Sequence, residues 1–155
     1  PDRGLAGERS QVEAIVQEIR KWRPRAVFAP YWIDRHPDHV ACSRLVEEAV
    51  FNAKLRRYAP DMPAWTVGRL YFYFINDAAD ADAAVDVSGV YESKIAALSA
   101  YRSQFAPEGA DAVETPLTAG YIRNVERRDA LLGASLGVRF AEGFKTRQPL
   151  MVSYF

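Results

Sequence analysis

This 155-residue chain has one cysteine, two histidines and no net charge. The cysteine count and the charge balance limit the compartment and the partners that we expect. The single cysteine, Cys42, cannot form an internal disulfide, so we expect a reducing compartment, by default the cytoplasm. Twenty basic side chains balance twenty acidic ones, which leaves no charged surface of the kind that a nucleic-acid partner requires. No apolar run approaches the roughly 18 residues of a membrane-spanning helix. We therefore expect a soluble globular protein with no nucleic-acid or membrane partner.

The two histidines of the chain, His36 and His39, lie within four consecutive residues of the segment FAPYWIDRHPDHVACS. Unrelated core or surface histidines would rarely occur so close together. The nearby Cys42 has apolar neighbours at helical spacing, which favours a packing role for the thiol over a reactive one.

Helical and strand patterns alternate along the chain. Apolar residues recur at helical spacing over residues 8–22, and the run AVFAP at 26–30 is typical of a parallel strand buried on both faces. Further elements are expected as helices at 37–58, 89–105 and 121–136 and as strands at 67–77 and 83–88. Within 89–105 we expect Val90, Ile95, Leu98 and Tyr101 to face inward, and the tail from 137 is assigned no element. Alternating helices and apolar strands predict an α/β layered fold.

The segment DRHPDH follows the carboxyl end of the strand at 26–30, and ligands bind beyond the carboxyl ends of strands in open α/β sheets. Imidazoles three residues apart can converge there, flanked by Asp34, Arg35 and Asp38. These are the ingredients of half a metal site, since a catalytic zinc usually has three protein ligands. Taken alone, the same pattern also fits two histidines that cap a helix or lie in solvent.

The segment FAPYWIDRHPDHVACSRLVEEAVFNAKLRRY closely resembles the central signature of the LmbE-like (PIG-L) zinc-dependent de-N-acetylases. DVSGVYESKIAALSAYRSQF, ETPLTAGYI and GVRFAEGFKTRQPL follow it in family-like order. Within that superfamily the chain looks most like the bacillithiol-biosynthesis branch, which removes acetate from N-acetylglucosaminyl-malate. The resemblance implies a Rossmann-like, mostly parallel sheet flanked by helices.

Residue by residue, the resemblance implies that His39 is a zinc ligand and that His36 assists the transition state as an acid or an oxyanion stabiliser. It implies that Asp38 orients and charges His36, and that Arg35 binds substrate, with the malate carboxylate as its partner. Tyr121 resembles a tyrosine that lies over the site and hydrogen-bonds the substrate carbonyl. A packed ring at a helix start explains Tyr121 equally well. The implied cofactor is one zinc ion per chain, with Fe²⁺ or Co²⁺ as alternatives.

The chain departs from the family pattern at one point, because it contains no A-H-P-D-D motif. In the family that motif supplies the remaining zinc ligands and the general base. We therefore expect residues 1–155 to be the C-terminal two-thirds of a single LmbE-like domain that lacks its N-terminal strand or strands, inactive by itself.

Two alternatives stay open. One is a deacetylase that acts on another N-acetylglucosaminyl compound, and the other is a non-catalytic sugar-binding or interaction fragment. The expected partner is a small-molecule glycoside. Members of the bacillithiol branch can form higher oligomers, so the resemblance also leaves room for a homo-oligomer.

Overall fold

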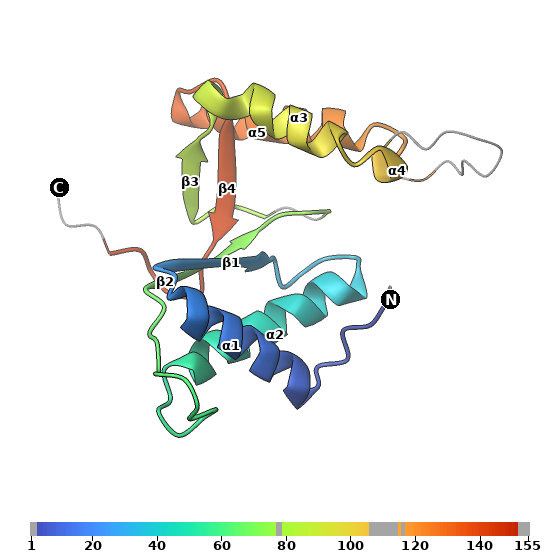
Figure 1. Cartoon of the computed structure of the whole chain (residues 1–155). Helices are drawn as coiled ribbons and strands as arrows, with labels where there is room; N and C mark the ends of the chain where they lie inside the picture. Colours follow the sequence, from blue (N-terminus) through green and yellow to red (C-terminus); the bar gives the residue numbers. More distant parts are fainter. Residues whose placement is uncertain (1–2, 77–78, 106–114, 116, 152–155) are drawn as a thin grey trace. The chain divides into compact units, whose positions relative to one another are not determined.

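The computed structural model describes residues 3–76, 79–105, 115 and 117–151, and the chain divides into two compact units. The first unit comprises residues 1–83 and 144–155, and the second comprises residues 84–143. The strands are hydrogen-bonded in the order β1-β2-β4-β3, with helices α1 to α5 along the chain (Figure 1). This is the α/β class that the sequence predicted. Within the described part of the chain, no helix has the length and apolar character needed to cross a membrane.

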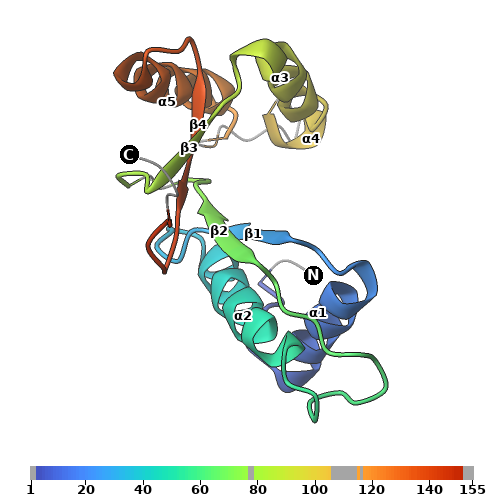
Figure 2. The ribbon, with the colours of Figure 1, turned by 90° about the vertical axis from the view of Figure 1, so that its left-hand side faces the viewer.

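In the first unit, α1 (Arg9–Trp22) and α2 (Pro37–Ala53) pack side by side on one face of β1 (Ala26–Pro30) and β2 (Arg69–Tyr73) (Figures 1 and 2). Fully burying one aliphatic side chain stabilises the fold by about 1.5–3 kcal/mol. The buried residues form two clusters: Val12, Val16, Ile19, Leu45, Ala49 and Ala53, and beside them Ala29, Tyr31, Val46 and Phe72. Cys42 packs against the second cluster, as its neighbours predicted.

The parallel pairing of β1 with β2 decides which loops meet. Ala26 lies opposite Arg69 and Pro30 opposite Tyr73, and the pairing continues because Tyr31 donates its N–H to the carbonyl of Tyr73 at 2.8 Å. The carboxyl ends of parallel strands lie at the same edge of a sheet. The loop that follows β1 and the loop that follows β2 therefore begin side by side.

The other face of β1 carries aromatic residues. The ring of Phe28 lies 5.5 Å from the rings of both Tyr71 and Phe144, and Phe28 is 53% exposed. The expectation that β1 is buried on both faces is therefore wrong. Among the described residues, α1 and α2 cover the face of Ala29 and leave Phe28 outside the core.

A single buried arginine ties the first helix to the end of the second. Arg20 is 1% exposed, and its guanidinium donates to the last carbonyls of α2 and to the loop behind it. The acceptors are the carbonyl oxygens of Asn52, Ala53, Leu55, Ala59 and Met62. The carbonyl of Ala53 also accepts from the N–H of Trp65 at 2.9 Å. Since these carbonyls have tertiary partners, α2 ends at Ala53 and not at residue 58, where the sequence placed its end.

The second unit contains a 3₁₀ turn (Ser88–Val90) and the helices α3 (Tyr91–Ser99), α4 (Arg102–Phe105) and α5 (Tyr121–Leu136). It also contains all of β3 (Ala83–Asp86) after Ala83 and the first three residues of β4 (Ala141–Lys145). At its centre the ring of Tyr91 stacks on Phe140 at 3.7 Å, and its hydroxyl donates to Asp129 at 3.1 Å. Asp129 is 2% exposed and also accepts from Lys94 at 2.7 Å. Burial and the adjacent Asp129 charge raise the pKa of Tyr91.

The second unit corrects two expectations. The single helix predicted over residues 89–105 is broken, and Val90 and Tyr101 are 60% and 64% exposed instead of facing inward. Tyr91 takes the inward position because its ring and hydroxyl both find partners. Strand β4 was not predicted at all, and its residues Phe144 and Lys145 pair antiparallel with β2.

Candidate active site

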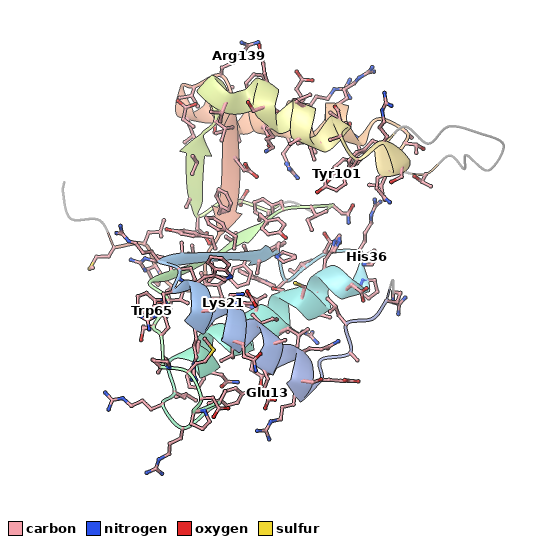
Figure 3. All side chains as sticks on the ribbon, in the orientation of Figure 1. Glu13, Lys21, His36, Trp65, Tyr101 and Arg139 are labelled. Atoms are coloured by element: carbon pink, nitrogen blue, oxygen red, sulfur yellow. The ribbon has the colours of Figure 1, made fainter. Side chains whose placement is uncertain are left out.

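The segment after β1 is short and ends in a well-defined helix start. Pro37 stands in the first turn of α2, as predicted, where its missing N–H costs nothing. His36 is the N-cap residue with extended backbone angles, and its Nδ1 accepts the N–H of Asp38 at 3.2 Å. Figure 3 shows His36 at the amino end of α2, beyond the carboxyl end of β1. An imidazole here takes the part that a serine or aspartate side chain usually plays at a helix start.

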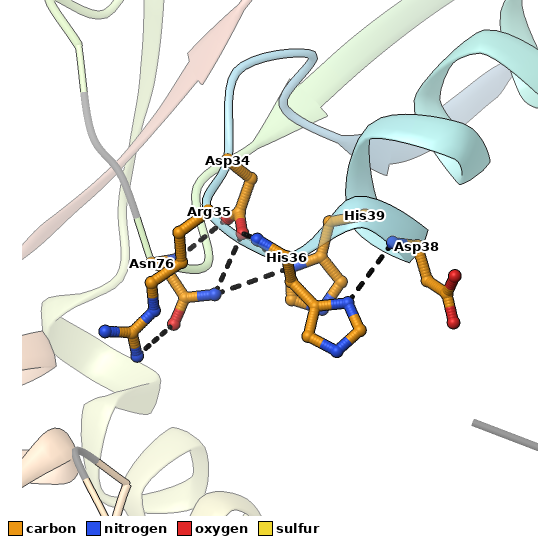
Figure 4. A network of polar contacts seen from close by, with 6 residues as sticks. All are labelled: Asp34, Arg35, His36, Asp38, His39 and Asn76. Atoms are coloured by element: carbon orange, nitrogen blue, oxygen red, sulfur yellow. Dashed lines mark hydrogen bonds and ion pairs between the residues drawn. The ribbon is translucent and has the colours of Figure 1, made fainter. Parts of the chain in front are cut away.

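Asp34 is the most connected side chain of the segment, and its side chain is 2% exposed. Its carboxylate accepts the N–H of His36 at 2.8 Å, the N–H of Asn76 at 3.1 Å and the side-chain amide of Asn76 at 2.9 Å (Figure 4). Burial alone would raise the pKa of this carboxyl. Hydrogen bonds from the Asn76 side chain, from the His36 and Asn76 backbone and from the His39 ring outweigh burial and lower the pKa to about 2. Asp34 is therefore ionised and can only accept hydrogen bonds.

The charge of Asp34 fixes the tautomer of His39. Nδ1 of His39 lies 3.0 Å from Oδ1 of Asp34, so Nδ1 must carry the proton that this contact shares. The amide nitrogen of Asn76 also lies 3.5 Å from the same Nδ1, but a protonated Nδ1 cannot accept from it. The two shorter contacts, His39 to Asp34 and Asn76 to Asp34, therefore define the hydrogen bonds, and the Asn76 side-chain amide donates to Asp34. When neutral, His39 therefore has its lone pair on Nε2.

His36 has the opposite tautomer. Because Nδ1 of His36 accepts the N–H of Asp38, that nitrogen carries no proton, and a neutral His36 is protonated on Nε2. The two rings are stacked, with centroids 4.7 Å apart and planes inclined by 28°. The convergence that the H-x-x-H spacing predicted is thus observed. One ring of the pair presents a lone pair at Nε2 and the other presents an N–H.

The remaining predicted residues have different surroundings. Arg35 is exposed, and its guanidinium donates to Oδ1 of Asn76 at 3.0 Å. Asp38 contacts His36 through its backbone N–H, while Figure 4 shows its carboxylate directed away from the His36 ring. Tyr121 begins α5 in the second unit, where its ring stacks on Phe105 at 5.4 Å. Its predicted role above the histidines stays a prediction.

Sequence reasoning gave no role to two residues of this site, Asp34 and Asn76. Asp34 was noted only as a neighbour of the histidines, and Asn76 only as the polar end of a β-prone run. The signal that could have found Asn76 is topological. If the strands at 26–30 and 67–77 are parallel neighbours, the residues that follow them must meet.

The described residues fit part of a zinc site. A metal-ligating histidine usually donates its second ring N–H to a carboxylate, which is the relation of His39 to Asp34. Within the described part of the chain, however, no group of three or more His, Cys, Asp or Glu side chains could hold a metal ion. The described residues thus offer one oriented imidazole ligand and not a complete ligand set.

Comparison with known proteins points to the class that this site suggests. The sequence model of the GlcNAc-PI de-N-acetylase family, PIG-L, matches residues 1–50, which include both histidines. A 1D-myo-inositol 2-acetamido-2-deoxy-alpha-D-glucopyranoside deacetylase of Rhodococcus opacus (strain B4) is 29% identical over 164 residues. That match covers 84% of this chain and 56% of the relative, so the chain spans just over half the length of this curated relative.

Two solved structures share the fold. The conserved protein TT1542 from Thermus thermophilus has a TM-score of 0.87 and 36% identity, over 98% of this chain and 64% of that one. The N,N'-diacetylchitobiose deacetylase from Pyrococcus horikoshii has a TM-score of 0.74 over 93% of this chain and 53% of its own, and its 23% identity shows the fold alone. The family match and the curated relative support a relationship to the PIG-L de-N-acetylases.

Proposed function

We propose that the protein containing this chain is a zinc-dependent hydrolase that removes the acetyl group from an N-acetylglucosaminyl compound. The observation that carries the proposal is the pair of stacked imidazoles with opposite tautomers beyond the carboxyl end of β1. A metal-dependent hydrolase of an amide needs a ligand for its metal and a donor for the developing oxyanion. His39 and His36 offer these two functions from adjacent rings.

In this proposal His39 holds zinc through Nε2, with Asp34 fixing the ring through Nδ1. Bound there, zinc polarises a carbonyl group and lowers the pKa of water in its coordination shell. Fe²⁺ or Co²⁺ would suit the same nitrogen ligand. We propose that the other ligands and the general base come from further residues of the full-length protein. The two histidines of this chain are already assigned, and its relatives are longer.

His36 acts on the substrate. Its Nε2–H donates to the acetamide oxygen as negative charge develops there, and the N–H of Asp38 at Nδ1 keeps the proton on that side. The loss of one oxyanion donor costs about 2.7–4 kcal/mol, or roughly 10²–10³ in rate. Asp38 and Tyr121 are proposed to assist, Asp38 by orienting the His36 ring through its backbone N–H and Tyr121 as a second donor through its hydroxyl.

The substrate is the finer part of the proposal. A guanidinium suits a carboxylate, so Arg35 favours an N-acetylglucosaminyl conjugate that carries one, of which the malate conjugate of bacillithiol biosynthesis is our first choice. The Rhodococcus relative is named for an inositol glycoside, and this observation makes the inositol conjugate the second candidate.

The test measures the release of free amine by the full-length protein from N-acetylglucosaminyl-malate, N-acetylglucosaminyl-inositol and N,N'-diacetylchitobiose. We expect the highest kcat/KM with the malate conjugate and a selective loss of that preference in Arg35→Gln. A preference for the inositol conjugate would support the proposed deacetylase activity and contradict the proposed malate substrate. If the zinc-loaded protein releases amine from none of the three, the non-catalytic alternative replaces our proposal.

A further inference from the structure

Asn76 lies just beyond the carboxyl end of β2 and contacts two residues of the segment that precedes α2, Asp34 and Arg35. Its backbone N–H and side-chain amide both donate to Asp34, at 3.1 and 2.9 Å, one to each carboxylate oxygen. Its side-chain oxygen accepts from Arg35 at 3.0 Å. Figure 4 shows the amide between the guanidinium on one side and the Asp34 and His39 side chains on the other.

These contacts fix the orientation of the Asn76 amide. The oxygen must face the guanidinium of Arg35, because arginine is only a donor, and the nitrogen must face Asp34, because an ionised carboxylate is only an acceptor. An aspartate at position 76 has the same shape but would place a second carboxylate against Asp34. The isosteric change therefore separates the chemistry of the amide from its volume.

Asp34 can orient His39 only while its carboxylate stays where the Nδ1–H of His39 reaches it. The Oδ1 atom that accepts from His39 at 3.0 Å is the atom that receives the Asn76 amide at 2.9 Å. Without that amide, the carboxylate loses a neutral donor and one of its tethers to β2. The ring of His39 is then free to exchange the proton between Nδ1 and Nε2.

We propose that Asn76 is a positioning residue of the active site: it holds Asp34 so that His39 presents a bare Nε2, and it holds Arg35 at the same edge of the sheet. This inference rests on the proposed function for its link to catalysis. Its structural core, the control of the His39 tautomer by a residue 37 positions away in sequence, does not require that the protein be a deacetylase.

The first test reads the tautomer directly. The full-length protein is labelled with ¹⁵N-histidine, stripped of metal with a chelator and examined by long-range ¹H–¹⁵N correlation at a pH where both rings are neutral. Difference spectra of His36→Gln and His39→Gln identify the two rings. We expect His39 to be protonated on Nδ1 and His36 on Nε2. In Asn76→Ala, which removes one tether of Asp34, His39 should shift toward the Nε2-protonated form while His36 keeps its tautomer. Asn76→Asp should keep His39 protonated on Nδ1, because its carboxylate offers a further acceptor beside that nitrogen.

The second test measures zinc affinity by competition with a chromogenic chelator. Changes to residues that orient a metal ligand typically cost 10–100-fold in affinity, and we expect a loss in this range for Asn76→Ala. Asn124→Ala, an exposed asparagine of α5, serves as the matched control and should keep both the affinity and the tautomers. Asn76→Ser provides a further variant should Asn76→Ala fail to fold.

The outcomes separate the two proposals. A shifted His39 tautomer in a protein without deacetylase activity would support the positioning role and sink the proposed function. An active enzyme in which Asn76→Ala retains the wild-type His39 tautomer and zinc affinity would overturn the positioning role alone.

Discussion

At the scale of single residues, Arg20 shows how much one side chain can organise. It is buried in the first unit, and no acidic partner is needed because its donors are taken by carbonyl oxygens at the end of α2 and in the following loop. A cation at a helix C-terminus also interacts favourably with the helix dipole. The same side chain therefore ends α2 and fixes the loop that leads to β2.

We predict that Arg20→Met destabilises the full-length protein by about 1–3 kcal/mol, because the carbonyls of Ala59 and Met62 lose the Arg20 donor and a carbonyl left without a donor costs about that much. The measurement is the midpoint of urea unfolding followed by circular dichroism. Lys21→Met is the matched control on the same helix, since Lys21 is exposed and its ion pair with Glu18 is worth at most about 1 kcal/mol. Equal losses of unfolding free energy in the two variants would show that the Arg20 hydrogen bonds do not stabilise the fold.

The residues of the site were predictable to different degrees. The spacing of His36 and His39 and the strand before them were sufficient to place two imidazoles together. The opposite tautomers were not predictable. The tautomer of His36 depends on the backbone N–H of Asp38, and that of His39 depends on the side-chain position of Asp34, which no local sequence pattern indicates. The place of Asn76 in the site depends on the parallel register of β1 and β2, which pairs segments more than 40 residues apart in sequence.

At the scale of elements, local patterns predicted helices at 8–22 and 121–136 and a strand at 26–30, and the structure has them at Arg9–Trp22, Tyr121–Leu136 and Ala26–Pro30. The apolar residues of these segments are distinctive enough to define them. Trp22 shows that the helical spacing of apolar residues does not always predict burial. It continues the apolar stripe of α1, yet it is 71% exposed, and its indole N–H donates to Glu18 at 2.8 Å. Strand β4, with its glycine and charged residues, has no alternating pattern, and its pairing with β2 and β3 defines it.

The ion pair that joins α3 to α5 provides the prediction at this scale. Lys94→Met would leave the buried carboxylate of Asp129 without its closest cation, and breaking a buried pair in this way costs about 3–5 kcal/mol. We expect a value at the lower end because Lys94 is 20% exposed and Asp129 keeps the Tyr91 hydroxyl. Thermal unfolding of Lys94→Met, Asp129→Leu and the double variant would measure the coupling.

The double variant should be more stable than Lys94→Met alone, because it removes the uncompensated charge. Arg9→Met, which removes an exposed ion pair with Glu13, is the control and should change stability by less than about 1 kcal/mol. Strictly additive losses for Lys94 and Asp129 would mean that the pair is not coupled.

At the scale of the whole molecule, the first unit combines an edge strand with an exposed aromatic face. β1 is the terminal strand in the order β1-β2-β4-β3, and Phe28, Tyr71 and Phe144 form the aromatic cluster on the face away from α1 and α2. Unpaired edges and apolar patches are the features through which chains associate.

We predict that the 155-residue chain, expressed alone, aggregates or folds poorly, and that Phe28→Lys increases its soluble fraction by reducing the apolar patch. Sedimentation velocity of the purified chain and of this variant would measure both effects. Val85→Lys, which replaces an exposed apolar residue outside the aromatic cluster, is the control. A monomeric wild-type chain with a cooperative thermal transition would contradict the prediction and favour an independent module.

The division of roles between the two stacked histidines is the central claim, and it is tested most directly by zinc content and steady-state kinetics of His39→Ala and His36→Ala in the full-length protein. His39→Ala should lose both zinc and turnover, because a catalytic zinc normally has three protein ligands and only two would remain. His36→Ala should keep about one zinc per chain and lose roughly 10²–10³ in kcat with a smaller change in KM. Loss of zinc in His36→Ala with retention in His39→Ala would exchange the two roles, and full activity in both variants would contradict the deacetylase proposal itself.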